Sequence, residues 1–461
     1  MPTFDLIVRN GTIVTERGTV RADLAIAGGR FVDVGADVPG TARDVLDLDG
    51  RVILPGAIDA HVHFNEPGRD HWEGWQTGSA ALVAGGATTC IEMPLNAHPP
   101  TLDAASFRLK AQRAADSSRV DFALWGGLTP DNLDELHDLA NAGAIGFKAF
   151  MAPSGLDDFP WADDYTLLTG MQIAAALGLP VAVHAENEAI ITGLTAAAVA
   201  QNRLSVGDYL ASRPVVTEIE AIGRAITLAE ETGCSLHIVH VSTGRGVTMV
   251  AAAQERGVDV TCETCPHYLI FTEEDAERIG ALAKCAPPLR DATTQEELWA
   301  ALLAGDIDLI ASDHSPAPPE MKVGVDFFAI WGGIEGCQHL LPALITAGRE
   351  RGLTMGDVAR LSAGNVARRF RLAGKGGIVV GNDADFSWGA FTDPAPVPLD
   401  EVQYRHPHSI WDDYPMAYRI QGTAVRGSIV YRDGKVVGRQ RGNLIRPHQP
   451  GEPMWPFDDR D

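Results

Sequence analysis

Residues 56–63 have the sequence Gly-Ala-Ile-Asp-Ala-His-Val-His, a short apolar run that ends in two histidines. Seven further runs of similar length occur between about residues 55 and 370, and the segments between them show helical periodicity. Short apolar strands that alternate with helices predict repeated βα units on a parallel sheet. Because eight such units close a barrel, we expect an α/β fold with a (β/α)8 TIM barrel. The further runs are residues 87–93, 120–125, 144–150, 180–184, 235–241, 259–263 and 308–313.

A doubly wound open sheet is the alternative arrangement of such units. Its commonest signature is a Gly-x-Gly-x-x-Gly turn directly after a strand. No such turn follows any of the eight runs. The sequence therefore favours the barrel.

Both ends of the chain contain short alternating strands separated by tight turns. They occur within residues 4–50 and again at residues 377–380, 384–388, 423–431 and 435–437. We expect the two sets to pair into one small flanking β-sandwich, with the barrel inserted between them. The expected divisions are residues 1–54 for the first part of the sandwich, 55–372 for the barrel domain, and 373–461 for the second part and a C-terminal tail.

The composition excludes several classes of partner. The 461 residues include 37 Lys+Arg and 61 Asp+Glu, which gives a formal net charge of −24. Nucleic acids and anionic membranes select basic surfaces, so this charge argues against both. The chain shows neither a secretion signal nor an apolar run long enough for a membrane span. The six cysteines are few for the length, and we expect a cytoplasmic protein with reduced thiols.

Histidines and an aspartate at the ends of the predicted strands indicate a metal site. His61 and His63 lie two residues apart on one strand, so both imidazoles face the same side and can reach one ion. His184, His240 and Asp313 end the fifth, sixth and eighth runs. In a (β/α)8 barrel these ends meet at the C-terminal face, where active sites of this architecture lie. The five residues are therefore candidate metal ligands.

Lys148 ends the fourth run and would point into the same cluster. Divalent cations would repel an ordinary ammonium group at that position. Carboxylation of the amine by CO₂ would give an anion with two oxygens, which can bridge two metal ions. A buried lysine that is neutral or paired with a carboxylate is the alternative interpretation.

Two other motifs contain ligand-type residues at unsuitable spacing. His237 lies three residues before His240, so on a strand the two rings face opposite sides and cannot share a metal. We interpret His237 as a structural histidine. Cys262 and Cys265 have the same spacing, and no second Cys-x-x-Cys pair is present to complete a zinc site.

These motifs, in this order, resemble the cyclic amidohydrolase branch of the amidohydrolase superfamily, which includes dihydroorotase, hydantoinase and allantoinase. The resemblance implies that His61 and His63 bind one metal ion, that His184 and His240 bind the other, and that carboxylated Lys148 bridges them. It implies that Asp313 is both a ligand and the proton-transfer group. It further implies two divalent ions per subunit, with Zn²⁺ expected and Co²⁺, Mn²⁺ or Fe²⁺ as alternatives, in a homotetramer. The matching segments are residues 55–63, 146–150, 183–186, 237–242, 263–268 and 312–316.

Within this branch, several loop segments resemble the allantoinase group. Dihydroorotases place an Arg and an Asn on the substrate carboxylate where this chain has Asn65 and Ala286. An anion without those partners would be costly in a closed site. Arg69 and Arg290 are close in sequence and could compensate, so dihydroorotase stays open as an alternative. The segments that resemble allantoinases are residues 64–68, 92–96, 312–322, 331–334 and 405–409.

The expected reaction is therefore hydrolysis of the hydantoin ring of allantoin to allantoate, a step of purine and ureide degradation. Hydantoinase or dihydropyrimidinase activity is a second enzymatic alternative, and a scaffold relative that has lost its ligands is the non-enzymatic one. The expected substrate contacts are Asn96, Ser315, Met151, Gly332 and Gly333. Loop capping, or core packing for Met151, is the alternative role of these residues.

Overall fold

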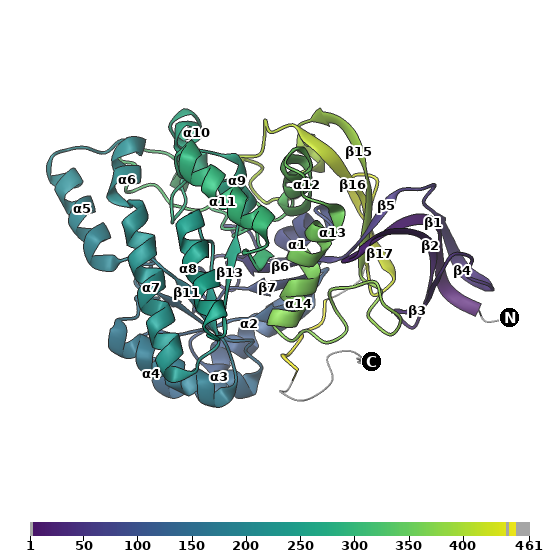
Figure 1. Cartoon of the computed structure of the whole chain (residues 1–461), viewed down its shortest axis with the longest axis horizontal. Coiled ribbons are helices and arrows are strands. Elements are labelled where there is room, and N and C mark those ends of the chain that lie inside the picture. The colour runs from purple at the N-terminus through teal and green to yellow at the C-terminus, as the bar shows by residue number, and fades with distance from the viewer. Residues whose placement is uncertain (1–2, 439–441, 449–461) are drawn as a thin grey trace.

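The computed structural model describes residues 3–438 and 442–448 of the chain. Its centre is a ring of parallel strands surrounded by helices (Figure 1). One arc of the ring pairs β6, β7 and β8, and the other pairs strands in the order β14-β13-β12-β11-β10-β9. The strands are β6 (Ala57–Val62), β7 (Ala87–Glu92), β8 (Asp121–Leu124), β9 (Gly126–Gly127), β10 (Phe147–Phe150), β11 (Val181–His184), β12 (Leu236–Ile238), β13 (Val260–Thr264) and β14 (Leu309–Ile310).

Hydrogen bonds between the last and first strand regions close the ring. The N–H of His63 donates to the carbonyl of His314 at 2.8 Å, and the N–H of His314 donates to the carbonyl of His61 at 3.3 Å. The expected (β/α)8 barrel is thereby confirmed. All residues of β6 and β7 are buried, which explains why these strands appear in the sequence as nearly continuous apolar runs.

The helices begin and end at residues suited to those positions. Asp163 and Asp291 accept hydrogen bonds from backbone N–H groups at the first turns of α4 and α11. Gly178 and Gly233 end α4 and α7 with left-handed backbone, which glycine adopts without strain. The helices are α1 (Trp75–Ala84), α2 (Ala104–Ser117), α3 (Leu136–Ala142), α4 (Asp164–Leu177), α5 (Glu188–Ala200), α6 (Val206–Ser212), α7 (Val215–Thr232), α8 (Gly244–Glu255), α9 (Pro266–Ile270), α10 (Glu273–Ile279), α11 (Ala292–Ala304), α12 (Leu340–Glu350), α13 (Met355–Ala359) and α14 (Asn365–Arg369).

None of the helices within the described ranges combines the length and the apolar composition that a membrane crossing requires.

Both ends of the chain form one sheet beside the barrel, as the sequence predicts (Figure 1). Its strand order is β18-β17-β16-β15-β5-β1-β2-β3, and β4 pairs with β1. The antiparallel pair of β5 and β15 joins the two ends. The strands are β1 (Thr3–Thr15), β2 (Gly18–Ala27), β3 (Arg30–Gly35), β4 (Thr41–Asp47), β5 (Val52–Pro55), β15 (Phe386–Ala395), β16 (Met416–Val425), β17 (Ser428–Arg432) and β18 (Lys435–Val436).

Two details of this sheet differ from the sequence prediction. Residues 377–380 are not a strand, because the glycines that flank this segment turn the chain. Residues 423–431 form parts of two strands, because Arg426 and Gly427 take positive φ values of 44° and 71° and make a hairpin turn. Most of the expected C-terminal tail, residues 449–461, lies outside the described residues.

A buried ion cluster joins the sheet to the barrel. The Nζ atom of Lys375 lies 2.6 Å from Asp121 at the start of β8 and 2.6 Å from Asp385, which directly precedes β15. Asp383 is a third partner at 3.0 Å, and Arg426 also contacts Asp121. Because burial desolvates all of these charges, the carboxylates depend on the ammonium group between them.

Replacing Lys375 with Met should lower the free energy of unfolding by about 3–5 kcal/mol, because it leaves buried carboxylates without their shared cation. Urea denaturation measures this change. The exposed Lys435, replaced with Met in the same way, serves as the control and should change stability by less than about 0.5 kcal/mol. Equal stability of the two variants would show that this cluster does not hold the sheet to the barrel.

Candidate metal centre

The end of β6 and the segment after β14 bring three ligand-type residues together. The Nε2 atoms of His61 and His63 lie 3.2 and 3.6 Å from Oδ1 of Asp313. One potential ligand atom from each residue lies within 4.8 Å of the others. Two imidazoles and a carboxylate at this spacing are suited to a divalent metal ion.

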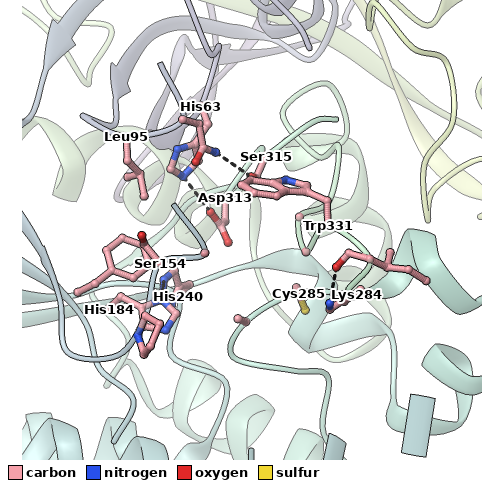
Figure 2. A pocket seen from close by; sticks show the side chains of 18 of the residues that line it. His63, Leu95, Ser154, His184, His240, Lys284, Cys285, Asp313, Ser315 and Trp331 are labelled. Carbon is pink, nitrogen blue, oxygen red and sulfur yellow. Dashed lines mark hydrogen bonds and ion pairs between the residues drawn. The ribbon is translucent and has the colours of Figure 1, made fainter. Parts of the chain in front are cut away.

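A second pair of imidazoles faces the same cavity (Figure 2). Nδ1 of His184, at the end of β11, lies 3.1 Å from Nε2 of His240, just after β12. The ring of His240 is 5.4 Å from the ring of His61. The ring of His184 stacks on Phe150 at 4.5 Å, which fixes its plane. The structure therefore gathers the four predicted histidines and Asp313 at one end of the barrel.

Lys148 lies in β10 and is fully buried. Within the described residues, its Nζ atom has no hydrogen-bond partner, and it lies 5.1 Å from the centre of the Phe150 ring. Burial lowers the pKa of Lys148 to about 7, although the charges of Glu263 and Asp313 act in the opposite direction. An unpartnered buried amine is costly in a native fold, so the position of Lys148 beside the histidines needs an explanation.

Two buried carboxylates orient the imidazoles, and the sequence analysis did not identify them. Glu263 accepts from Nδ1 of His61 at 2.5 Å, which leaves Nε2 of that ring facing Asp313. Glu186 bonds Nε2 of His184 at 2.8 Å, which leaves Nδ1 facing His240. Carboxylates behind histidine ligands commonly fix the ring tautomer and orientation. One feature of the sequence could have identified these two glutamates: Glu263 ends a predicted strand, and Glu186 lies two residues after another.

The electrostatics of Glu263 follow from its two histidine partners. Its second oxygen bonds Nε2 of His237 at 3.1 Å, and Nδ1 of His237 bonds Thr261 at 2.9 Å. Burial alone would raise the pKa of Glu263, but His61 and His237 hold it well below its usual range. His237 is thus a fully bonded histidine behind the centre, in agreement with the structural role expected for it.

The backbone is strained at the same place. His240 and Asp313 have φ values of 40° and 47°, and Asn65 and Asn96 have values of 65° and 68°. Positive φ costs roughly 1–3 kcal/mol per residue when the residue is not glycine. Such strain gathers at functional sites, where the surrounding structure holds side chains in positions that unstrained backbone would not give.

The side chains surround a cavity of about 350 Å³, a volume suited to a small molecule (Figure 2). Asn96, Ser315, Gly332 and Gly333, all expected substrate contacts, line it. The amide of Asn96 donates to the Ser315 hydroxyl at 3.4 Å. Met151 is not among the lining residues, because it is buried in the hydrophobic core of the barrel.

The arginines that might have received a substrate carboxylate have other partners. Arg69 donates to the carbonyls of Asn96 and Ala97 at 3.0 and 3.2 Å. Arg290 donates to Ser242 at 2.9 Å and lies 3.3 Å from Glu218. Neither lines the cavity. They support loops around the site instead.

The chain is similar to known hydrolases over nearly its whole length. The model of the amidohydrolase family matches residues 52–430. A protein named allantoinase from Rubrobacter xylanophilus is 56% identical over 97% of this chain and 99% of its own length. One from Deinococcus radiodurans, also named allantoinase, is 50% identical over 96% of this chain and 99% of its own length.

Solved structures agree with this relationship. The L-hydantoinase (dihydropyrimidinase) of Arthrobacter aurescens superposes with a TM-score of 0.93 and 36% identity, over 96% of this chain and 100% of that one. The dihydropyrimidinase of Brevibacillus agri gives 0.90 and 29%, over 97% and 99%. At one end of the barrel lie histidines and an aspartate that could hold a divalent ion. The match to the family model and the similarity to these relatives show that the chain belongs to the amidohydrolase family.

Proposed function

We propose that this protein is an allantoinase, which opens the hydantoin ring of allantoin by hydrolysing its cyclic amide to give allantoate. The observation that carries the proposal is the convergence of four histidines and Asp313 around one small cavity, with the unpartnered Nζ of Lys148 5.1 Å from the ring of Phe150, which also lines it. The relatives named allantoinase, at 56% and 50% identity over nearly the full chain, support the choice of substrate.

The proposed ligand sets follow the geometry of the two histidine pairs. His61, His63 and Asp313 would hold one divalent ion, and His184 and His240 would hold the other. Lys148 would contribute to both sites as a carbamate, since carboxylation would replace an unpartnered buried amine with an anion that metal ions can neutralise. Two ions there would acidify a water molecule and polarise the ring carbonyl. Zn²⁺ is the expected metal, although such ligands also accept Co²⁺, Mn²⁺ and Fe²⁺.

Asp313 has the proton-transfer role in this proposal. Burial raises its pKa, but His61 and His63 lower it by more, so the carboxylate stays ionised at neutral pH. It can therefore accept a proton from the attacking water and donate that proton to the leaving ring nitrogen. Asn96 and Ser315, which line the cavity, would orient the ureide group.

The cavity argues against dihydroorotate as the substrate. Its carboxylate would need partners, and Asn65 and Ala286 occupy the positions that hold an Arg and an Asn in the dihydroorotase pattern. Arg69 and Arg290 do not line the cavity. The two cationic side chains that do line it are engaged elsewhere: Arg213 pairs with Glu186, and Lys284 donates to the carbonyls of Phe328 and Ile330. Hydantoinase activity is the second candidate, because the superposed L-hydantoinase shares the whole fold at a TM-score of 0.93.

A cytoplasmic homotetramer remains the expected form of the enzyme.

Purified metal-loaded protein should hydrolyse allantoin with a kcat/KM at least about tenfold above that for hydantoin, dihydrouracil or dihydroorotate. The reason is that Asn96 and Ser315 would bind the ureide substituent, which the competing substrates lack. Turnover of all four under identical conditions measures this preference. If the protein hydrolyses any of the other three compounds faster than allantoin, that compound is the better assignment.

Replacing Lys148 with Ala should remove most of the bound metal and lower activity by at least about a thousandfold. Elemental analysis and allantoin turnover measure the two losses, and a short-chain carboxylic acid should restore part of both by replacing the bridge. Lys435→Ala is the matched control and should retain metal and activity. Full activity in the Lys148 variant would exclude the carbamate bridge. A wild-type protein without metal would exclude the proposed centre and favour a scaffold role.

Replacing Glu263 with Gln should weaken metal binding by about 10–100-fold, because His61 loses the charge that orients and polarises it. Competition with a chelator measures the affinity. Glu255→Gln, on the exposed side of α8, is the control. Unchanged affinity would mean that Glu263 supports the fold without tuning the metal centre.

A further inference from the structure

Lysine is rare in this chain and is mostly buried. Only six lysines occur, so arginine supplies most of the 37 basic residues. Five of the six are buried and Lys435 is exposed. Because a buried ammonium group must be compensated by specific partners, each of the five needs an explanation.

Three of the five buried lysines are already explained. Lys110 pairs with Glu92, Lys375 joins the sheet to the barrel, and Lys148 belongs to the metal centre. Lys284 and Lys322 remain.

Both remaining lysines bind one segment of the cavity wall. We call residues 323–334 the wall loop, of which residues 328–333 line the cavity. The Nζ atom of Lys284 donates to the carbonyls of Phe328, at 3.0 Å, and Ile330. The Nζ atom of Lys322 donates to the carbonyl of Gly333. Figure 2 shows Lys284 and Trp331 at the side of the cavity opposite His184 and His240.

The backbone of the wall loop also contacts Lys284 and Ser315 directly. The N–H of Gly333 donates to the carbonyl of Lys284 at 2.7 Å, so three hydrogen bonds join Lys284 to the wall loop. A Cβ atom at Gly333 would lie 2.2 Å from the carbonyl oxygen of Ser315, a proposed substrate contact. A small movement of the wall loop therefore changes the space beside Ser315.

Apolar packing secures only part of the wall loop. Phe327 packs against Tyr209 of α6 at 5.4 Å between ring centres, and Trp331 packs edge-on against Trp72 at 4.8 Å. The first residues of the loop, by contrast, are open to solvent, with Val323 71% and Val325 95% exposed. Hydrogen bonds from the two lysines to three carbonyls thus supply order that the hydrophobic core does not.

We propose that Lys284 and Lys322 are positioning residues that clamp the wall loop and thereby determine which ring substituents the cavity admits. The inference rests on the proposed function, because it concerns the selectivity of that site. The two lysine Nζ atoms hold the loop carbonyls in place and keep the wall close to Ser315. Without the clamp, the wall would retreat, a small ureide would bind more weakly, and a bulkier substituent would be accepted.

The test compares Lys284→Met, Lys322→Met and Lys284→Arg in the metal-loaded full chain, with Lys435→Met as the matched control. Kinetics use allantoin and 5-benzylhydantoin, a hydantoin with a bulky substituent. In the Met variants the KM for allantoin should rise about tenfold while kcat stays within about twofold. The preference for allantoin over 5-benzylhydantoin should fall about tenfold. Lys284→Arg, which keeps a cationic donor, should recover part of the loss.

Limited digestion with chymotrypsin gives a readout that does not depend on turnover. Cleavage after Phe327, Phe328 or Trp331 should be about tenfold faster in the Met variants than in wild type or Lys435→Met, because a released loop opens more often. Unchanged KM, preference and cleavage in both Met variants would overturn the clamp. A fall in kcat at constant KM would also overturn it, because the lysines would then act on the chemical step.

The two proposals fail separately. If wild type does not hydrolyse allantoin, the proposed function falls, and digestion alone decides the clamp: faster cleavage supports it and equal cleavage refutes it. If Lys284→Met does not fold, Lys322→Met decides, because this substitution removes a single hydrogen bond, the one to the carbonyl of Gly333.

Discussion

The hydrogen bonds that close the strand ring are the constraint on which the site depends. They run between the backbones of His63, His314 and His61, with lengths of 2.8 and 3.3 Å. Because they place the end of β6 beside the segment after β14, Asp313 faces His61 and His63 directly. His184 and His240 arrive from the other arc of the ring because all parallel strands end at the same rim. The centre thus follows from closure of the barrel, with no local loop motif required.

The barrel and the inward-facing residues were predictable because both depend on spacing. A strand repeats every two residues, so the separation of His61 from His63 fixes a shared face without any knowledge of the tertiary structure. The roles of Glu186 and Glu263 were not predictable in this way. A buried carboxylate is explained only by the partners that neutralise it. Glu263 binds His61 and His237, which lie 202 and 26 residues away in the chain, and Glu186 binds Arg213 as well as His184 two residues before it. Their position at or beside the ends of predicted strands marks both glutamates as candidates, but it does not show which distant side chains they bind.

Segments near glycines were the other weak point of the prediction. The β-branched residues 378–380 favour a strand, but Gly376 and Gly381 take φ values of 83° and 96° and turn the backbone on both sides. Met151 follows an apolar strand and was expected at the cavity wall. Its side chain packs into the core instead, while its N–H donates to the carbonyl of His184 at 3.0 Å. Side-chain direction just beyond a strand depends on that local backbone path, which residue type does not specify.

The distribution of lysine has a practical consequence for labelling. Among the described residues, Lys435 on β18 is the one lysine that is exposed to reagents. Lysine-directed reagents such as activated esters should therefore modify the folded protein at a single side chain in the flanking sheet. Immobilisation through that side chain would orient every molecule alike and leave the lysines of the barrel chemically untouched.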